Sequence, residues 1–509
     1  MLFNTFLFIF VFAPVTLIGF FLVARLGNIY GALWLGLASL VFYVAWDPRY
    51  LILLLGSIMF NYLAGRGLAH RMAPSARTRR GTLLAMAITA NLTLLAYYKY
   101  ANFFVDNIDH VLGFQLSIPN VVLPLGISFF TFTQIAFLVD TFRGDVKELN
   151  FIHYLLFVTY FPHLIAGPIL HHAEMMPQFR LSRVYRFNPD NFSSGVVIFA
   201  IGLFKKAILA DGVAQFVGPV FDAAERGASP MLFDAWGGAL AYTFQLYFDF
   251  SGYCDMAIGL SWMIGIALPL NFNSPYKAIN ITDFWRRWHM TLSRFLRDYL
   301  YIPLGGNRRG PTRRYANLLA TMAIGGLWHG AGWNFVIWGM LHGAYLVIHH
   351  AWHAVQGHLG LRVPQRLGTV LAWLLTFVAV VVGWVLFRAQ SLAGAGRILG
   401  GMVGAHGCAL PDGWIACTAR DVGAASSALA GLWVWIWCAG LAAIALGLPN
   451  TQEFMRDQLS GITRPVAIGP AAVRIAFRRS TTWAIAVSAL LAAGLISLPQ
   501  PTSFLYFNF

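Results

Sequence analysis

Charged residues are scarce in this chain. Of its 509 residues only 11% are Asp, Glu, Lys or Arg, whereas 58% are hydrophobic and 15% are aromatic. Ordinary soluble proteins carry roughly 25% charged residues, so this composition excludes a water-soluble globule as well as disordered, collagen-like and coiled-coil chains. The long apolar runs are each about the 20 residues that cross a bilayer. We therefore expect an all-α, polytopic integral membrane protein.

Acidic residues are the scarcer of the two signs of charge. The chain has 20 Asp and Glu against 35 Lys and Arg, which gives a formal net charge of +15. In a membrane protein such a surplus indicates basic loops on the cytoplasmic side. A phosphate-bearing cytoplasmic substrate could use the same basic surface, and nucleic acid is not expected as a partner.

Cysteine is also rare, and its four copies are Cys254, Cys408, Cys417 and Cys438. They show no Cys-x-x-Cys spacing, so we expect no metal site and no thioredoxin-like site. Cys408 and Cys417 could form a disulfide if their loop faces an oxidising compartment.

Several catalytic motifs are absent as well. The chain has no Gly-x-Ser-x-Gly elbow, no phosphate-binding loop, no His-Glu-x-x-His zinc site and no dinucleotide fingerprint. No histidine is followed five residues later by aspartate, the spacing of glycerolipid-type acyltransferases. Serine hydrolysis, ATP-driven transport, zinc proteolysis and that class of acyltransferase all lose support.

The apolar runs define the membrane plan. The first run, from Leu2 to Ala24, is too long and too aromatic for a signal-peptide core, and we expect it to be a retained span. Two later runs are long enough to be double, which predicts roughly 11 to 14 membrane segments. The later runs lie near residues 30–45, 49–64, 82–104, 121–140, 151–170, 193–210, 234–270, 315–353, 367–388, 427–448 and 481–498.

The intervals between these runs are short. None is large enough for a separate soluble domain, and no internal repeat is visible, so we expect one membrane-embedded domain over residues 1–509 with its motif-bearing core at about 121–389. The basic segment from Arg66 to Arg80 predicts a cytoplasmic loop, which would place the N-terminus outside after three spans.

Ionisable groups at membrane depth are costly, so each is a functional candidate. His349, His350 and His353 end an apolar run, and His171 and His172 lie in a polar loop, so interfacial solvation explains all five. Two other histidines are not explained in this way.

The first of these two is His289, in the segment DFWRRWHMTLSRFLRDYL at residues 283–300. At about 100° per residue this segment projects as a two-faced helix. One face carries the apolar and aromatic residues Trp285, Trp288, His289, Leu292, Phe295, Leu296, Tyr299 and Leu300, and the other carries Arg286, Arg287, Arg294, Arg297 and Asp298. We expect an interfacial or re-entrant helix that turns its arginines to water or phosphate and its imidazole into the protein. The alternative is a satisfied core histidine.

The second is His329, in the segment GGLWHGAGWNF at residues 325–335. Glycine at this density is expected to break or open a helix, and irregular backbone at membrane depth is tolerated where it is buried or lines a wet cavity. If helical, the stretch from Arg314 places His329 roughly 20 Å into the bilayer. Burial there favours the uncharged imidazole, which can act as a base. The alternative is a histidine that only packs helices.

Two further segments are weaker candidates. In YFDFSGYCDMAIG, residues 247–259, Asp249 and Asp255 flank Ser251 in an apolar region. They could line a polar cavity or bond to a neighbouring helix. In YFPHLIAGPIL, residues 160–170, His163 lies beside Pro162, and an unwound membrane helix or a purely structural role would both fit.

Taken together, WRRWHMTLS at 285–293, PLGGNRRG at 303–310 and LWHGAGWNFVIWGMLHG at 327–343 resemble the membrane-bound O-acyltransferase superfamily. Within it the chain is most similar to the branch that O-acetylates bacterial polysaccharides such as alginate. Supporting stretches lie at 124–140, 161–169, 247–259, 271–276 and 383–389, and at the terminal FLYFNF. Residues 401–479 carry little that is diagnostic of the family.

The resemblance implies a helical fold around a tunnel, through which a cytoplasmic acyl donor reaches an acceptor on the far side. It implies His329 as the catalytic base and His289 as a second functional position. Acetyl-CoA or another acyl thioester would be the donor, with no bound cofactor. The donor and substrate contacts would come from Trp285, Arg286, Arg287, Trp288, Arg294, Arg297, Trp328 and Asn334, joined by Arg308 and Arg309, although the arginines could equally be positive-inside anchors.

The resemblance also implies a multi-pass protein of the bacterial inner membrane. Its acetyl group would pass to a periplasmic or cell-surface partner of the SGNH type, or to polysaccharide assembly proteins, because the chain itself has no SGNH-type hydrolase motif. Two alternatives remain open. One is D-alanyl transfer to teichoic acid, as in a related branch, and the other is a transporter or channel, which could also use broken helices and buried ionisable groups.

Overall fold

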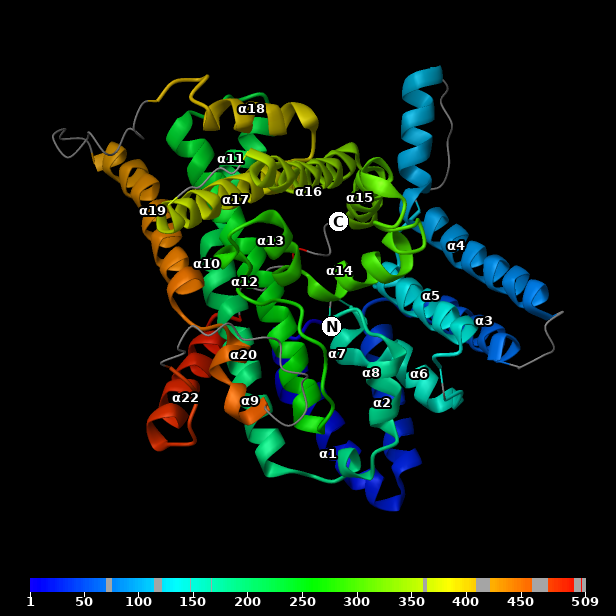
Figure 1. The fold of residues 1–509 in the computed structure, drawn as a ribbon. Coiled ribbons are helices and arrows are strands. Elements are labelled where there is room, and N and C mark those ends of the chain that lie inside the picture. The colour runs from blue at the N-terminus through cyan, green and yellow to red at the C-terminus, as the bar shows by residue number, and fades with distance from the viewer. Residues whose placement is uncertain are drawn as a thin grey trace.

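The computed structural model describes residues 1–69, 76–113, 121–146, 148–165, 167–359, 364–408, 422–459, 475–498 and 505. Within these residues the chain is helical and has no strand, which confirms the expected all-α fold (Figure 1). The N-terminal helices are α1 Ala13–Val23, α2 Asn28–Val44, α3 Leu51–Ala69, α4 Ala76–Leu112 and α5 Ile127–Arg143.

The middle of the chain combines short helices with two long ones. Its helices are α6 Phe151–Thr159, α7 Phe161–Leu164, α8 His172–Phe179, α9 Pro189–Phe204, α10 Asp211–Ala214, α11 Val217–Glu225 and α12 Leu232–Ile264. The helix is interrupted near His163, because the non-helical Tyr160 separates α6 from α7. An unwound helix is one of the two readings that the sequence allowed. His163 Nε2 lies 2.9 Å from the carbonyl oxygen of Phe157, which is a structural contact.

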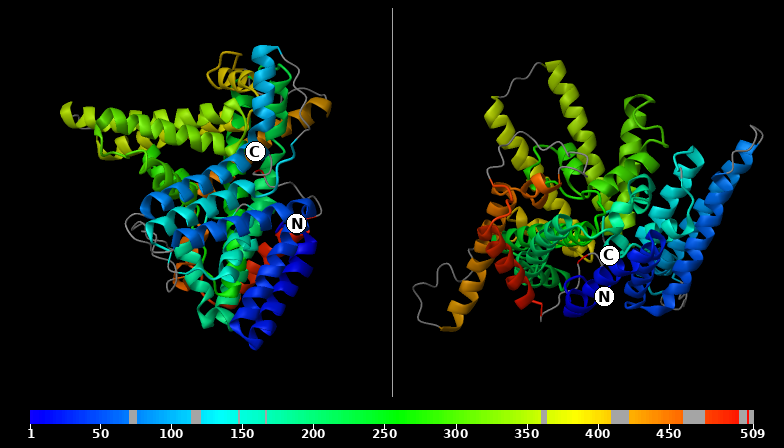
Figure 2. Two further views of the ribbon diagram at one scale, coloured as in Figure 1. Left: turned by 90° about the vertical axis from the view of Figure 1, so that its right-hand side faces the viewer. Right: turned by 90° about the horizontal axis from the view of Figure 1, so that it is seen from below.

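The helices that follow carry the candidate site and the C-terminal part. They are α13 Ile281–Arg287, α14 Met290–Leu296, α15 Gly310–His329, α16 Trp333–Leu359, α17 Gln365–Arg388, α18 Leu392–Met402, α19 Val422–Gly447, α20 Thr451–Phe454, α21 Arg456–Leu459 and α22 Thr481–Ile496. Figure 2 shows α16 and α17 running across one end of the molecule. The run at 315–353 is double as expected, whereas the run at 234–270 forms the single helix α12.

Among the described residues, four helices are long and apolar enough to cross a membrane, namely Phe8–Leu26, Pro48–Ala69, Thr78–Leu112 and Gln365–Arg388. Three shorter apolar helices lie at Asn28–Val44, Gly431–Gly447 and Thr481–Ile496. Large apolar side chains on these helices point outward, such as Ile52, which is 81% exposed, and Leu375, which is 73% exposed. An apolar exterior of this kind suits lipid and not water. The chain is an all-α integral membrane protein, and the number of its membrane segments stays a prediction.

The long helix α12 packs against α9 at backbone distance. A Cβ atom on Gly195 would lie 2.6 Å from the carbonyl oxygen of Gly259, and one on Gly202 would lie 2.6 Å from that of Gly252. Each distance is too short for any side chain, so glycine is required at these crossing points. Small residues of this kind let membrane helices approach closely. As a result almost the whole of α12 is buried.

Buried ion pairs reinforce this contact. Two lysines in the π-helical turn η5, Lys205–Ala210, face the aspartates of α12. Lys205 Nζ lies 2.7 Å from Asp255 Oδ2, and Lys206 Nζ lies 2.6 Å from Asp249 Oδ1. These are the helix-to-helix contacts that the sequence allowed for the two aspartates. Ser251, which lies between the two aspartates in the sequence, is also buried, at 3% exposure.

Candidate functional site

His289 lies at a break between two short helices. Between α13 and α14, Trp288 is extended and His289 has φ 43°, in the left-handed region that residues other than glycine rarely occupy. The prediction of a single amphipathic helix over residues 283–300 is therefore wrong. The segment consists of α13, the break, α14 and a π-helical turn η7, Arg297–Tyr301.

Asn271 provides the physical reason for this break. Its backbone carbonyl accepts the N–H of Met290 at 3.0 Å, and its side-chain Oδ1 accepts the hydroxyl of Thr291 at 2.9 Å. These contacts replace the hydrogen bonds that a continuous helix would have made within itself. Oδ1 also accepts from Nδ1 of His289 at 3.0 Å. With its proton on Nδ1, the neutral imidazole presents Nε2 as an acceptor.

The two-faced character of the segment is nevertheless as expected. Trp288, His289 and Leu292 are buried, whereas Arg286 and Arg297 are exposed. The break changes the direction of the backbone, but the apolar residues before and after it are buried on the same side of the segment.

His329 is the last residue of α15. It is 5% exposed, and the ring of His289, which is 1% exposed, lies 6.3 Å away between centroids. Trp328 borders both imidazoles, at 5.0 Å from His329 and 6.1 Å from His289. The structure thus brings together the two histidines that the sequence pattern identified, from segments that are separated by 40 residues in the chain.

The glycine-rich segment breaks the helix as predicted, at residues 330–332 between α15 and α16, whereas the glycines at 326 and 339 lie within these two helices. They bring α15 against α16, because a Cβ on Gly326 would lie 2.1 Å from the carbonyl oxygen of Phe335, and one on Gly339 would lie 2.2 Å from that of Met322. The backbone leaves the helix at Gly330, directly after His329. The imidazole therefore sits on a rigid helix end and not within an unwound stretch.

The end of α15 is held by α4. Lys99 Nζ donates to the carbonyl oxygens of Trp328, at 2.5 Å, and His329, at 3.2 Å. The hydroxyl of Tyr100 donates to that of Leu327, at 2.8 Å. The last four carbonyls of an α-helix have no partner within the helix, and these bonds satisfy three of them. Sequence reasoning missed Lys99, although a lysine within the apolar run at 82–104 is the kind of signal that could have found it.

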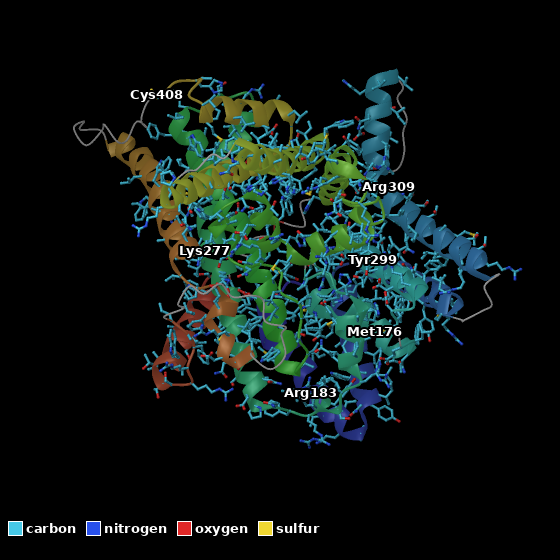
Figure 3. The ribbon with its side chains drawn as sticks, in the orientation of Figure 1. Met176, Arg183, Lys277, Tyr299, Arg309 and Cys408 are labelled. Carbon is cyan, nitrogen blue, oxygen red and sulfur yellow. The ribbon has the colours of Figure 1, made fainter. Side chains whose placement is uncertain are left out.

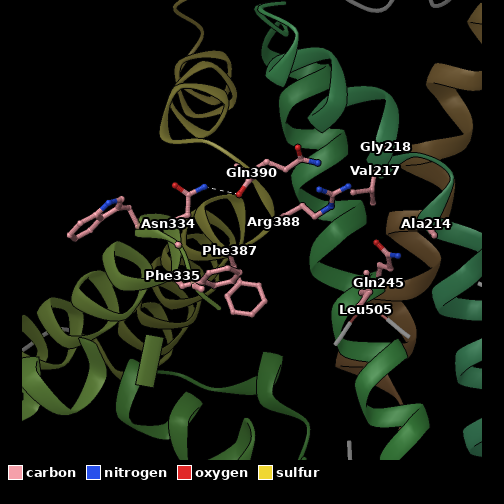
Figure 4. Close-up of a pocket in the computed structure, with 14 residues that line it drawn as sticks. Ala214, Val217, Gly218, Gln245, Asn334, Phe335, Phe387, Arg388, Gln390 and Leu505 are labelled. Atoms are coloured by element: carbon pink, nitrogen blue, oxygen red, sulfur yellow. Dashed lines mark hydrogen bonds between the residues drawn. The ribbon is translucent and has the colours of Figure 1, made fainter. Parts of the chain in front are cut away.

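Two cavities lie near His329. The first, of about 130 Å³, is lined by His329, Trp328 and Lys99 together with residues of the 123–129 segment. The second, of about 460 Å³, is lined by Asn334, Phe387 and Arg388 among others (Figure 4). The ring of Phe387 lies 5.2 Å from that of His329, so this phenylalanine lies between the second cavity and the imidazole.

Asn334 stands in the wall of the second cavity, where its side-chain amide donates to the carbonyl oxygen of Ala389 at 2.6 Å (Figure 4). Neither cavity is lined by Asp249, Ser251 or Asp255. The structure therefore brings together Trp328, His329 and His289, whereas the aspartates of α12 face η5 and the predicted arginines line neither cavity.

The sequence model of the membrane-bound O-acyltransferase family matches residues 29–389 of this chain. That match covers more than two thirds of the sequence and contains α13 to α17 with both buried histidines. The chain belongs to the membrane-bound O-acyltransferase family. It is an acyltransferase, as the resemblance of its motifs implies.

Several relatives are similar over most of their length. A peptidoglycan O-acetyltransferase of Helicobacter pylori is 47% identical over 437 residues, which is 81% of each chain. A probable alginate O-acetylase of Pseudomonas aeruginosa is 43% identical over 404 residues, 78% of this chain and 74% of the relative. A teichoic acid D-alanyltransferase of Bacillus subtilis is 28% identical over 281 residues, 53% of this chain and 70% of the relative.

Within this O-acyltransferase the arginines of the basic face are largely engaged by carboxylates. Arg287 bonds to Asp283 at 2.9 Å, and Arg294 makes a two-pronged contact with Glu174. Arg297 bonds to the neighbouring Asp298, at 2.7 Å. Arg286, Arg308 and Arg309 are exposed. Figure 3 shows Arg309 on the same side of the molecule as Tyr299, and Cys408 on the opposite side.

His172 is buried and not a solvated loop residue, which corrects the expectation for it, whereas His171 lies in the loop before α8 and is half-buried. His172 is 4% exposed, with Nδ1 3.2 Å from Asp140 Oδ2. The hydroxyl of Tyr299 donates to the same oxygen at 2.7 Å and lies 3.1 Å from Nδ1 of His171. This network fastens η7 to the end of α5. Cys417 lies outside the described residues, so its pairing with Cys408 stays a prediction.

Another buried imidazole close to His329, that of His342 on α16, was missed by sequence reasoning. It is 0% exposed, and its ring packs 5.2 Å from Trp285 and 4.8 Å from Trp338, which itself lies 5.1 Å from His329. Among the described residues neither ring nitrogen of His342 has a hydrogen-bond partner. The signal that could have found it is its place in the motif at 327–343.

Because an unpartnered buried polar group carries a desolvation cost, His342→Phe is expected to leave the thermal unfolding temperature unchanged or to raise it. Phenylalanine fills the same space without polar atoms. Unfolding in detergent measures this, with His163→Phe as the matched control, because His163 has a backbone partner and its loss should lower the temperature. A lower unfolding temperature for His342→Phe would show that its nitrogens are satisfied in the membrane.

Proposed function

We propose that this protein is an O-acetyltransferase that takes an acetyl group from acetyl-CoA, or another acyl thioester, for O-acetylation of peptidoglycan or of an exopolysaccharide. The observation that carries the proposal is a buried His329 that lines a cavity beside a second buried histidine, in a chain whose relatives include a peptidoglycan O-acetyltransferase and probable alginate O-acetylases. Family membership favours an enzyme over the transporter alternative.

In the proposed reaction His329 is the general base. It takes the proton of the acceptor hydroxyl as the oxygen attacks the carbonyl carbon of the thioester, the carbon–sulfur bond breaks, and the leaving thiolate takes up the proton. A positioned base of this kind is typically worth about 100- to 10,000-fold in rate. His289 lies 6.3 Å from His329 and has its orientation set by Asn271, so it is suited to polarise a reacting group.

The acceptor belongs to the carbohydrate class in both leading relatives. A peptidoglycan acceptor is the first choice, since the peptidoglycan O-acetyltransferase is 47% identical to this chain and the probable alginate O-acetylase is 43% identical. Acetylation of either polymer outside the cytoplasm would place the protein in the bacterial inner membrane. It would also require a periplasmic or cell-surface partner of the SGNH type, or polysaccharide assembly proteins, to complete the transfer.

The test of the function is an assay with purified protein in nanodiscs and radiolabelled acetyl-CoA. Coenzyme A release that depends on an added polymer acceptor would support the proposal. In parallel, acetyl esters are measured in cell-wall peptidoglycan and in exopolysaccharide after deletion of the gene. If D-alanyl esters fall and acetyl esters do not, the teichoic-acid alternative holds, and if no ester changes, the enzymatic proposal fails.

Replacing Arg286 and Arg287 together by glutamine is expected to raise the KM for acetyl-CoA by several-fold to about 10-fold. Guanidinium groups suit the phosphate oxygens of a coenzyme A donor, and Arg286 is exposed on the polar face of α13. Initial rates against donor concentration measure the change, with kcat expected to stay within about twofold.

The matched control is the replacement of Arg183 and Arg186 by glutamine. Arg183 and Arg186 carry the same total charge and are also exposed, and Figure 3 shows Arg183 far from Arg309. If both double variants change the KM equally, the effect comes from net charge. If the variant at 286 and 287 loses only expression, the arginines are membrane anchors.

A further inference from the structure

Lys99 is a charged residue within the apolar helix α4, and it is half-buried. A lysine at membrane depth is costly and is kept where it has a specific partner. Here the partners are carbonyl oxygens and not a carboxylate, because Nζ donates to Trp328 and His329 and lies 3.5 Å from Ser128 Oγ.

These contacts place a cation at the C-terminal end of α15. The carbonyl groups of a helix end carry partial negative charge, and a positive side chain there is favourable. One of the two carbonyls belongs to His329 itself. The ammonium therefore acts on the backbone of the residue that the proposed function makes the base.

The same ammonium borders the cavity that His329 lines, and it lies 5.8 Å from the ring centroid of Trp328. Trp328 in turn stacks on Phe132 of α5, at 5.3 Å. Lys99 thus joins α4, the end of α15 and the wall of the cavity.

We propose that Lys99 is a positioning residue that fixes the backbone of His329, and hence the direction of its imidazole, through bonds to the carbonyl oxygens of Trp328 and His329. This proposal rests on the proposed function only for the role of His329. A small displacement of a catalytic group can cost a large factor in rate, because the reacting atoms must be aligned closely.

The neighbouring residue supplies a matched control. Tyr100 donates to the carbonyl oxygen of Leu327, on the same helix end and two residues before His329, through an uncharged hydroxyl. Tyr100→Phe removes one bond to the end of α15, as Lys99→Met removes two. If Lys99 only stabilised the end of α15, the two variants should lose kcat to a similar degree.

The experiment measures kcat and KM for donor and acceptor in four variants, together with thermal unfolding. Lys99→Met is expected to lower kcat at least about 10-fold with both KM values within about twofold, while Tyr100→Phe stays within about threefold of wild type. Lys99→Arg should recover part of kcat because a guanidinium can donate to both carbonyls. Lys99→Gln should recover less, since it lacks the charge.

Two outcomes of the kinetic measurements overturn the proposal. If Lys99→Met and Tyr100→Phe lose kcat equally, Lys99 is a general fastening of the helix end. If the KM of one substrate rises while kcat is unchanged, Lys99 binds that substrate in the cavity.

A second readout needs no turnover. The rate at which diethyl pyrocarbonate modifies His329, followed by mass spectrometry, should rise several-fold in Lys99→Gln or Lys99→Met and not in Tyr100→Phe. If His329 is modified at the same rate in the Lys99 variants as in wild type, the proposal is overturned. This result does not depend on whether any preparation shows acetyl transfer. Loss of turnover in wild type, by contrast, would count against the proposed function alone.

Discussion

Replacing His329 by alanine is expected to lower kcat for the proposed acetyl transfer by about 100- to 10,000-fold, because the acceptor hydroxyl would then lack a positioned base. The structure sharpens this expectation, since His329 lies at the end of a rigid helix and lines a cavity beside His289. Alanine removes the imidazole without adding bulk. The measurement is acceptor-dependent coenzyme A release by the purified variant at saturating donor.

The control for this result is the buried His163, whose ring nitrogen bonds to a backbone carbonyl. His163→Gln keeps a polar group near the carbonyl oxygen of Phe157 and lies outside the group around His329, so its kcat is expected to stay within about threefold of wild type. Thermal unfolding of both variants excludes a loss of fold. Equal and slow coenzyme A release by wild type and by the alanine variant would contradict the role of His329.

His289→Ala should act on the same step, and the double variant tests whether the two imidazoles work as a unit. Residues that act together in one step show effects that are far from additive. If His289 polarises the group that His329 deprotonates, the double variant should be scarcely slower than His329→Ala alone.

The sequence predicted the class of the protein and most of its helices because these depend on local properties. A run of apolar residues of bilayer length indicates a membrane helix whatever it packs against. The two faces of the segment at 283–300 were likewise predictable from spacing. The two buried histidines could be identified because an ionisable residue stands out against an apolar background.

What the sequence could not predict comes from contacts between distant segments. The break at His289 depends on Asn271, whose carbonyl and side-chain oxygens compete with the helical hydrogen bonds. Spacing within residues 283–300 carries no sign of that competition. The sequence predicted the helix break beside His329, but not that Gly326 and Gly339 bring α15 and α16 to backbone distance, because that depends on the contact between the two helices.

The aspartates of α12 show the same limit. Their two possible roles, in a cavity or against another helix, differ only in what lies opposite. The structure places lysines of η5 opposite both, at separations of 50 residues for Lys205 and Asp255 and 43 for Lys206 and Asp249, which the sequence could not pair. An expectation about stability follows from one of these pairs.

Replacing Lys206 by methionine is expected to lower the free energy of unfolding by about 3–5 kcal/mol. The side chains of Lys206 and Asp249 are 2% and 1% exposed, and Lys206 Nζ also lies 2.7 Å from Asp211 Oδ1. Methionine preserves the length of the side chain but leaves a buried carboxylate without its counter-charge. Thermal unfolding in detergent, followed at several denaturant concentrations, measures the loss.

Two further variants separate the ion pair from its packing. Lys206→Met combined with Asp249→Asn removes the stranded charge and should recover a large part of the stability, since a buried pair is replaced more cheaply than it is broken. Arg49→Met breaks an ion pair with Asp47 in which the arginine side chain is 76% exposed, so its loss should cost little stability. If Lys206→Met costs no more than Arg49→Met, the contact between η5 and α12 does not depend on charge, and the glycines of α9 and α12 must hold these helices together on their own.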